Sequence, residues 1–404
     1  QMFFSTILTL IVLSLGVAHC FRLLSRATKN SSSSLSQTEQ KRSKDPDYKQ
    51  MENIVEAFVE CVSQNNIGQA SSRQEQYKRG VTALCDFLKK GLFTGKDLLR
   101  RHSRRVFYFH RLAAARDVDG GVLVRSTVQF NLFGGSIVNL GCSAQQELLD
   151  DIFEKGEAGC FLLTESGAGV LSGLIVQTEA KFSKEKNGFI LHSPDPIEES
   201  RKNWISQGYT GKHGVVIARL ILQDGKDLGP HAFLIDMNAK GVLKQDMPRK
   251  TTFNSLDNGS IWFDHVLIPR ENMLSALSFV DEQGTYQTTT KEGFSFYKVA
   301  QRLLSGRIAL SAAALSKIGA IVEKIEAYAR NRHLPKFGSK TGEKIPLIQL
   351  PVLADALNRF HAVWRVYDTF VDQLEADFAN DDQPLDRDFV HRIACAKVQV
   401  LRFA

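Results

Sequence analysis

The spacing of apolar residues changes twice along the chain. In MENIVEAFVECVSQN (residues 51–65) four apolar residues recur at steps of three and four and predict an amphipathic helix: Ile54, Phe58, Val59 and Val62. After about residue 159 the apolar runs are short, rich in β-branched and aromatic residues, and separated by Gly, Asp, Asn and Pro, which is typical of strands. Helical spacing returns after about residue 291.

This order predicts an α+β fold in which a small β-barrel follows one helical domain and precedes another. We expect four segments: a targeting leader with low-complexity sequence (1–45), an N-terminal helical domain (46–156), a middle β-domain (157–278) and a C-terminal helical domain (279–404).

The C-terminal domain is expected to be an incomplete helical bundle. A long helix keeps seven apolar residues in register: Leu304, Ile308, Leu315, Ile318, Val322, Ile325 and Ala329. A second helix is predicted over about 353–379 and a third begins at Asp386. The apolar residues of this third helix would then be exposed: Val390, Ile393, Val398 and Leu401.

The first residues differ in composition from the rest. The stretch 3–18 is apolar or small throughout, and a Ser-rich stretch with Arg and Lys but no acid before Glu39 follows it. A signal-like segment followed by a transit-like segment is similar to the two-part leader of algae with complex plastids, which implies a plastid or the secretory route. A simple membrane anchor and a spurious upstream exon stay open. Residue 1 is Gln and not Met.

Composition narrows the class of protein without defining it. With 43% hydrophobic and 24% charged residues the chain is that of an ordinary globular protein. The six cysteines are scattered singly, which argues against both a zinc site and a disulfide framework, and we expect no metal. The basic cluster at 100–105 lacks any nucleic-acid motif, so no nucleic-acid partner is expected.

The stretch GCFLLTESGAG (159–169) carries the most informative chemistry. A Thr-Glu pair ends an apolar run, and two glycines and an alanine follow within four residues. A hydroxyl at a strand edge can offer a donor and an acceptor to a flat ligand, and small residues let that ligand approach the backbone. A turn that closes a β-hairpin is the alternative.

Several stretches together resemble the oxidase branch of the acyl-CoA oxidase and acyl-CoA dehydrogenase superfamily. The similarity covers about residues 85–378 and depends on VQFNLFGGSIVNLG (128–141), GCFLLTE (159–165), GPHAFLIDM (229–237), LDNGSIWFDHVLIPRENML (256–274) and DEQGTY (281–286). It implies an acyl-CoA dehydrogenase-like fold, FAD as the cofactor, a fatty acyl-CoA as the substrate and a homodimer.

The resemblance also assigns roles to residues. Thr164 would hydrogen-bond the flavin ring, with Gly169 in the small-residue stretch beside the cofactor. NWISQG (203–208) is similar to the dehydrogenase-type motif, so Trp204 would pack beside the ring and Ser206 would bond flavin N5. A buried core Trp is the alternative. The segment 167–170 lacks the His and Ser usual in oxidases, which puts contacts to the pantetheine in doubt.

The segment after the long helix resembles the family's contact with a neighbouring subunit's FAD. Arg332, Phe337 and Gly338 would correspond, and an Arg fork suits a pyrophosphate. A basic residue that complements the helix dipole is the alternative for Arg332. The family's glutamine pair is replaced by Leu353 and Ala354.

The family's chemistry needs a carboxylate that removes the α-proton of the acyl-CoA while hydride leaves the β-carbon. In the oxidase branch the resemblance places that Glu beyond residue 404, and at the dehydrogenase position this chain has Gln301. We favour a truncated oxidase that forms trans-2-enoyl-CoA in fatty acid β-oxidation, passes electrons to oxygen and works in the peroxisome. A non-catalytic scaffold or binding protein and a dehydrogenase with another acceptor stay open. We expect the protein to contact a membrane only through its N-terminal leader, if that leader is not cleaved.

Overall fold

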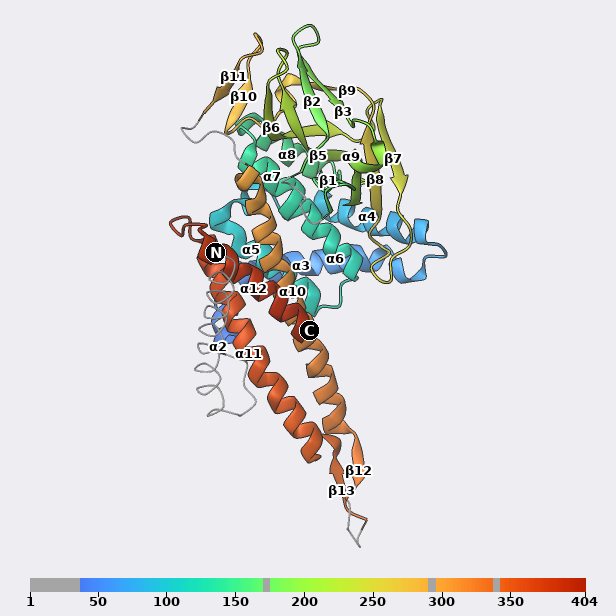
Figure 1. The fold of residues 1–404 in the computed structure, drawn as a ribbon. Coiled ribbons are helices and arrows are strands. Elements are labelled where there is room, and N and C mark those ends of the chain that lie inside the picture. Colours follow the sequence, from blue (N-terminus) through green and yellow to red (C-terminus); the bar gives the residue numbers. More distant parts are fainter. Residues whose placement is uncertain (1–36, 170–174, 290–295, 337–341) are drawn as a thin grey trace, which may run out of the picture.

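The computed structural model describes residues 37–169, 175–289, 296–336 and 342–404 (Figure 1). The predicted leader stretch 3–18, the flavin candidate Phe337 and its neighbour Gly338 lie outside these residues.

The first part of the described chain is helical, as the spacing predicts. Its helices are α2 (Gln37–Arg42), α3 (Pro46–Gln64), α4 (Arg73–Lys89), α5 (Ser103–Ala115), α6 (Gly120–Thr127), a π-helix (Val128–Gly134), α7 (Gly135–Leu140) and α8 (Ser143–Glu154), with short 3₁₀ turns at Ile67–Gln69, Gly95–Leu98 and Arg100–His102. α2 falls within residues 1–45, the stretch assigned to the leader. Its Arg42 is nevertheless buried and ion-paired to Asp368 at 2.7 Å, so α2 packs against the rest of the protein.

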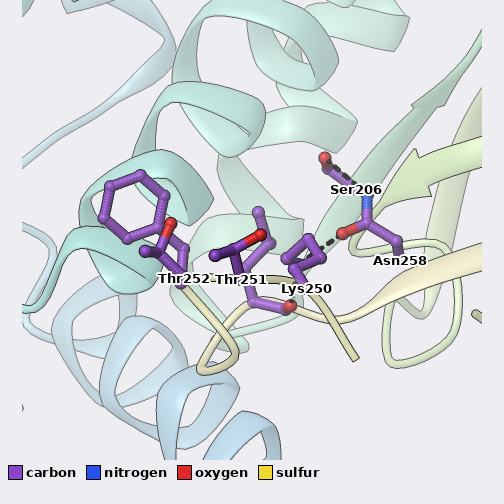
Figure 2. Close-up of a pocket in the computed structure, with 7 residues that line it drawn as sticks. Ser206, Lys250, Thr251, Thr252 and Asn258 are labelled. Carbon is purple, nitrogen blue, oxygen red and sulfur yellow. Dashed lines mark hydrogen bonds between the residues drawn. The ribbon is translucent and has the colours of Figure 1, made fainter. Parts of the chain in front are cut away.

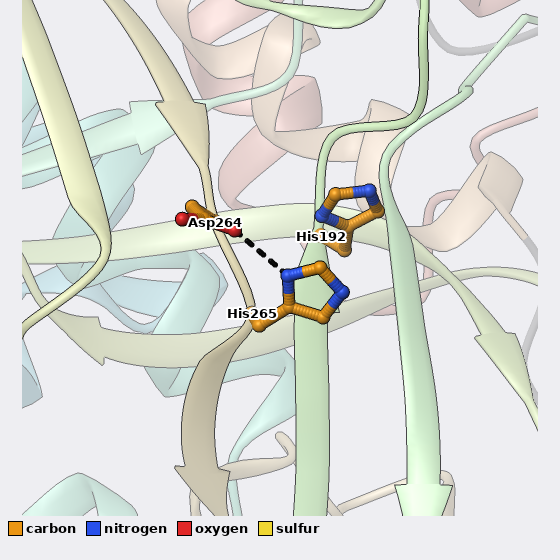
Figure 3. A group of neighbouring side chains, drawn as sticks. All are labelled: His192, Asp264 and His265. Atoms are coloured by element: carbon orange, nitrogen blue, oxygen red, sulfur yellow. Dashed lines mark hydrogen bonds and ion pairs between the residues drawn. The ribbon is translucent and has the colours of Figure 1, made fainter.

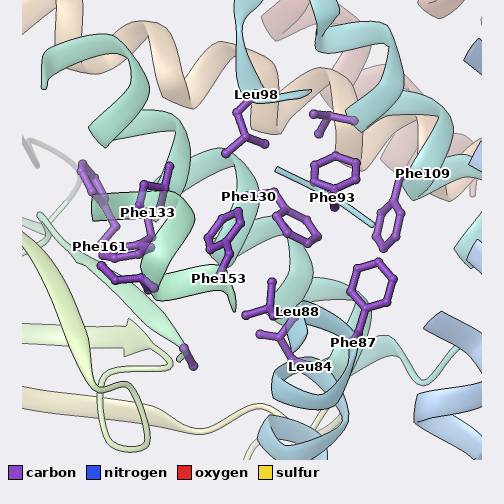
Figure 4. Close-up of a cluster of buried hydrophobic side chains, with 14 of the residues drawn as sticks. Leu84, Phe87, Leu88, Phe93, Leu98, Phe109, Phe130, Phe133, Phe153 and Phe161 are labelled. Atoms are coloured by element: carbon purple, nitrogen blue, oxygen red, sulfur yellow. The ribbon is translucent and has the colours of Figure 1, made fainter. Parts of the chain in front are cut away.

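The face that α3 buries differs slightly from the predicted one. Its buried residues are Met51, Ile54, Val55, Phe58 and Cys61, whereas Val59 and Val62 are only partly buried. The core behind it is rich in aromatic rings (Figure 4), for example Phe93 and Phe130 with centroids 4.5 Å apart. Burial of such rings stabilises this domain.

The middle part forms two sheets over one apolar core. The strands are β1 (Gly159–Leu162), β2 (Glu179–Ser183), β3 (Gly188–His192), β4 (Lys202–Ser206), β5 (His213–Ile221), β6 (Asp227–Asp236), β7 (Val242–Asp246), β8 (Asn258–Phe263) and β9 (Val266–Pro269), with a short helix α9 (Ile197–Ser200) before β4 and a 3₁₀ turn (Arg270–Asn272) after β9. One sheet has the order β1-β5-β2-β3-β9, with β6 also paired to β5, and the other has the order β4-β8-β7. A separate hairpin follows, β10 (Ser278–Val280) with β11 (Tyr286–Thr288).

Three long helices complete the described chain. They are α10 (Phe296–Asn331), α11 (Pro351–Ala379) and α12 (Arg387–Phe403), with the hairpin β12 (His333–Pro335) and β13 (Lys344–Pro346) and a 3₁₀ turn (Leu347–Gln349) between α10 and α11. The predicted third helix begins where expected, because the Asp386 side chain caps it by accepting from the Phe389 backbone N–H at 2.8 Å.

The C-terminal helices differ from the predicted burial at both ends. On α12, Ile393 is buried, so its predicted exposure is wrong, while Val398 and Leu401 are exposed. On α10, Leu304, Ile308, Leu315, Val322 and Ala329 are buried as predicted, but Ile325 is exposed. The C-terminal part of α10, β12–β13 and the N-terminal part of α11 extend away from the body (Figure 1) and are called the helical projection here.

A buried charge network joins α11 to the N-terminal helices. Arg111 on α5 contacts Asp368 at 2.7 Å and Glu375 at 2.8 Å, and Arg42 on α2 shares Asp368. Charges removed from water in this way need their partners, since one left alone is costly. Within the described ranges, no helix has the length and apolarity needed to cross a membrane.

Candidate flavin site

The segments that carry the sequence resemblance meet around β1. The π-helix supplies Gln129, whose side-chain oxygen accepts from the Gly159 backbone N–H at 2.8 Å. A Cβ at Gly159 would lie 2.3 Å from the ring of Phe133, so only glycine fits there. π-Helical turns are frequent at functional sites, and this one positions the strand that leads to Thr164.

The Glu of the Thr-Glu pair is structural. Glu165 is buried and forms an ion pair with buried Lys202 at 2.7 Å, while it accepts from the backbone N–H groups of Gln177 and Thr178 and from the Thr178 hydroxyl. Lys202 also donates to the Ile217 carbonyl, and burial lowers its pKa although Glu165 opposes that effect. The sequence prediction missed Lys202, because its partner is 37 residues away.

This ion pair holds the two predicted flavin motifs side by side. Glu165 and Lys202 form an antiparallel bridge, and the Asn203 N–H donates to the Thr164 carbonyl at 2.9 Å. Thr164 is half-buried at this edge, and Trp204 and Ser206 follow on β4. We call Thr164–Glu165 with Lys202–Ser206 the paired edge.

Trp204 occupies an unusual position on the paired edge. Its φ is +57°, in the left-handed region, where β4 has an irregular register against β8. A bulky residue in this region carries strain of about 1–3 kcal/mol, which is most often found at functional sites. The indole is 50% exposed, so the alternative of a buried core Trp is wrong.

Ser206 is held by residues that the sequence prediction did not select. The Asn258 amide donates to the Ser206 hydroxyl at 3.2 Å and to the Trp204 carbonyl at 3.0 Å. Lys250 in turn donates to the Asn258 amide oxygen at 2.5 Å (Figure 2). The hydroxyl oxygen of Ser206 is therefore an acceptor for Asn258, which leaves its proton to donate to a ligand.

A cavity of about 280 Å³ opens beside Ser206. It is lined by Ser206, Lys250, Thr251, Thr252, Phe253, Leu256 and Asn258. Burial is the main cause that lowers the pKa of Lys250. Such a mixture of hydroxyls, a cation and an aromatic ring suits a polar, planar ligand.

Asp257 fixes the strand that carries Asn258. It forms a buried ion pair with Arg125 of α6 at 2.7 Å and accepts from the backbone N–H groups of Tyr209 and Thr210. Burial acts to raise the pKa of Asp257, but Arg125 and Thr210 hold it below its usual value. The sequence signal was the motif LDNG, which the resemblance used without assigning roles within it.

The other predicted contacts are not gathered at the paired edge. Gly169 has φ +51°, and a Cβ added there would meet no atom within 4 Å; it lies next to the segment 170–174, which is outside the described residues. Arg332 is exposed at the end of α10, and Figure 1 shows that end far from β1 and β8. Within one chain the structure therefore separates Arg332 from Thr164 and Ser206.

Among the residues that the structure describes, the paired edge has no carboxylate other than Glu165, which is ion-paired to Lys202. Gln301 lies in α10, and its side chain is outside the described part of the chain. Glu375 is fully buried, and burial raises its pKa, but it is ion-paired to Arg111. The family's base is therefore not assigned to a residue here.

Comparison with known proteins agrees with this architecture. The mouse acyl-coenzyme A oxidase-like protein is 30% identical over 276 residues, 66% of this chain and 42% of that protein. Acyl-coenzyme A oxidase 2, peroxisomal, of Arabidopsis thaliana is 34% identical over 233 residues, 53% of this chain and 33% of that protein. No family model matches the chain.

Solved structures show the same fold. Acyl-CoA oxidase 1 from Yarrowia lipolytica superposes with a TM-score of 0.64 at 23% identity, over 91% of this chain and 56% of that one. Butyryl-CoA dehydrogenase from Megasphaera elsdenii gives a TM-score of 0.66 at 18% identity, over 93% of this chain and 86% of that one.

The fold and the motif segments define an acyl-CoA dehydrogenase-like protein. More specifically, the chain belongs to the acyl-CoA oxidase and dehydrogenase superfamily, with curated relatives that are named acyl-coenzyme A oxidase or acyl-coenzyme A oxidase-like protein. It spans less than half the length of these curated relatives.

Proposed function

We propose that this chain is an acyl-CoA oxidase that binds FAD and a fatty acyl-CoA and forms the trans-2-enoyl-CoA of fatty acid β-oxidation, with oxygen as the electron acceptor. The single observation that carries this proposal is the paired edge. Two motifs 40 residues apart are hydrogen-bonded neighbours there and present Thr164, Trp204 and Ser206 together.

These residues fit an isoalloxazine. The exposed indole of Trp204 offers a flat apolar face, and the half-buried Thr164 offers a hydroxyl at the strand edge. Ser206 has its proton directed outward by Asn258 and opens on the cavity. FAD bound here would accept the hydride that leaves the substrate's β-carbon. Gly169 would leave room beside it for the cofactor or the acyl chain.

The shared part of the site supports a homodimer in this proposal. Arg332 is exposed on the helical projection, away from its own paired edge, where a second chain can reach it. Arg332 and Phe337 would then contact the FAD of the partner subunit. A peroxisomal location is proposed because curated relatives are named peroxisomal acyl-CoA oxidases.

A non-catalytic acyl-CoA-binding relative is the second candidate. It is favoured by Gln301 at the dehydrogenase position of the base and by Ala168 where oxidases have His. An amide cannot accept the α-proton. A dehydrogenase with a protein electron acceptor is the third.

The test uses full-length protein expressed with ample riboflavin. Flavin absorbance that persists through gel filtration supports the flavoprotein, and its absence overturns the proposal. Peroxide release on addition of an acyl-CoA distinguishes an oxidase. Flavin bleaching without peroxide identifies a dehydrogenase, and bound flavin that is not bleached identifies the non-catalytic relative.

A further inference from the structure

Three potential ligands meet where the two sheets adjoin. His192 ends β3 in the six-stranded sheet, and Asp264 and His265 form the connection between β8 of the three-stranded sheet and β9. Their ligand atoms all lie within 4.8 Å of one another (Figure 3). None of these residues belongs to the paired edge or to the cavity beside Ser206.

The backbone beneath the group is held rigidly. The Ser193 N–H donates to the Phe263 carbonyl at 2.9 Å, and the Phe263 N–H donates to the Ser193 hydroxyl at 3.1 Å. Both residues are buried. His192 adjoins Ser193, and Asp264 adjoins Phe263, so both side chains extend from backbone that these hydrogen bonds hold in place. A ligand site needs such a preorganised backbone.

Gly241 supports the second segment from below. The Asp264 N–H donates to the Gly241 carbonyl at 2.9 Å. Gly241 has φ +94°, and a Cβ there would lie 2.4 Å from the Asp264 carbonyl oxygen. A side chain at position 241 would therefore displace the backbone that carries Asp264 and His265.

The arrangement of the two imidazoles is energetically unfavourable in the absence of a ligand. Their ring centroids are 4.2 Å apart with planes at 29°, and the His265 backbone has φ +51° in the left-handed region. The Nδ1 atom of His192 is shielded from solvent and has no hydrogen-bond partner. A buried polar atom without a hydrogen-bond partner destabilises the folded protein, and a bound ligand would supply that partner.

Asp264 and His265 already share a polar contact that a cation can replace. Asp264 Oδ1 lies 2.7 Å from His265 Nδ1, and both side chains are about two-thirds exposed. Two tetrahedral ligand atoms with metal bonds of about 2.0–2.2 Å lie about 3.3–3.5 Å apart, so a metal would increase the distance between these two atoms by about 0.6–0.8 Å. Exposed side chains can make that adjustment.

We propose that His192, Asp264 and His265 bind one divalent transition-metal ion, with Zn²⁺ the best match. Two imidazoles and one carboxylate favour Zn²⁺, Ni²⁺ or Cu²⁺ over Mg²⁺ and Ca²⁺. Water completes the coordination, because two of the three ligands face solvent. The ion links the end of β3 to the β8–β9 connection and so joins the two sheets.

This site was not expected from the sequence, where the absence of a metal was inferred from the cysteine spacing. The proposal is independent of the flavin, and its ligands come from segments that no short motif connects. Only the pairing of the Ser193 and Phe263 segments brings the three side chains together.

The test is a calorimetric titration of EDTA-treated full-length protein with Zn²⁺ alone. The background is Cys395→Ser, since that exposed thiol is a competing ligand. We expect one ion per chain in the micromolar range, and a loss of affinity of at least about tenfold in each of His192→Ala, Asp264→Asn and His265→Ala. His333→Ala, which removes an exposed histidine on β12, is the matched control and is expected to bind like the parent.

A second measurement protects the result from folding defects. Zn²⁺ is expected to raise the Tm of the parent and of His333→Ala but not that of His265→Ala, while all three have the same far-UV circular dichroism. Saturable binding that is unchanged in His265→Ala and His192→Ala would overturn the site. The absence of saturable 1:1 binding below millimolar Zn²⁺ would do the same.

Discussion

The paired edge buries polar side chains, whereas the helical projection exposes large apolar ones. At the paired edge the buried charges of Glu165 and Lys202 pair with each other within one chain, and Asn258 donates to Ser206. On the helical projection large apolar side chains face solvent: Ile321, Ile325, Tyr328 at 62% and Val352 at 84%. One region is complete within a single chain, whereas the other presents a surface that a second copy would bury.

The two regions therefore differ in the interactions that stabilise them. The paired edge depends on charges that are satisfied locally in low dielectric, so single substitutions there act on folding. In the proposed homodimer the exposed apolar side chains of the projection would be buried by association, so substitutions there are expected to act on assembly. The predictions below test this distinction.

Lys202→Met is expected to have the largest effect. It leaves Glu165 buried without its counter-charge, and breaking such a pair costs about 3–5 kcal/mol. Urea unfolding followed by circular dichroism measures the loss. The double variant Glu165→Gln with Lys202→Met is the control and should recover most of it. Equal stability of Lys202→Met and the parent would contradict a structural role for the pair.

Ile325→Lys is expected to weaken self-association by at least about a hundredfold without lowering the stability of the monomer. A charge buried at an apolar interface is strongly unfavourable, whereas at the solvent it costs little. Analytical ultracentrifugation gives the association constant and urea unfolding the stability. Leu267→Lys, at an exposed apolar residue of β9, is the control and should leave association unchanged. A parent protein that is monomeric at all concentrations would remove the basis of the comparison.

Asn258→Asp separates the accepting from the donating contacts of this residue. It keeps an acceptor for Lys250 but loses the donor to Ser206 and to the Trp204 carbonyl, so flavin affinity should fall by at least about tenfold, the size of one hydrogen bond. Fluorescence titration with FAD measures it, with Thr251→Val, which removes a hydroxyl lining the cavity, as the matched comparison. Unchanged affinity in Asn258→Asp would mean that Ser206 needs no orientation.

Asp117 gives the smallest effect, at the contact between the body and α10. Lys317 and then Lys324 donate to it and lower its pKa to about 2. Because this value lies below that of the unfolded chain, the stabilisation is present above about pH 4 and is lost as the pH falls towards 2. After solvent screening it amounts to less than about 1 kcal/mol. Asp117→Asn should show a smaller loss of stability than the parent between pH 4 and pH 2, and identical curves would contradict the contact.

Local patterns predicted the elements well, and the exceptions have physical causes. Strands such as β5 and β6 were found from their composition, whereas β4 and β7 were not, and the start of α12 at Asp386 agrees with the prediction. The apolar register of α10 continues through Ile325, but the helix leaves the body there, so the same spacing no longer means burial. For Trp204 the alternative was a buried Trp in the core of a β-domain, and the φ of +57° that accompanies its exposure has no signal in the sequence.

The candidate site divides in the same way. The motifs selected Thr164, Trp204 and Ser206, whose roles stay predictions. Lys202, Lys250 and Asn258 were not selected, because their importance depends on partners across strands. Arg332 was selected as a contact to a neighbouring subunit's FAD, which stays a prediction, and only the tertiary structure shows that it lies at the end of α10, far from β1 and β8 of its own chain.

By itself the sequence determined the order of helical and β segments and the superfamily, since periodicity and short motifs act over a few residues of contiguous backbone. The tertiary structure alone decided which charges are paired, that Trp204 faces solvent, and that His192 meets His265. These depend on strand register and on the packing of distant segments, where a shift of one residue would move every side chain to the other face.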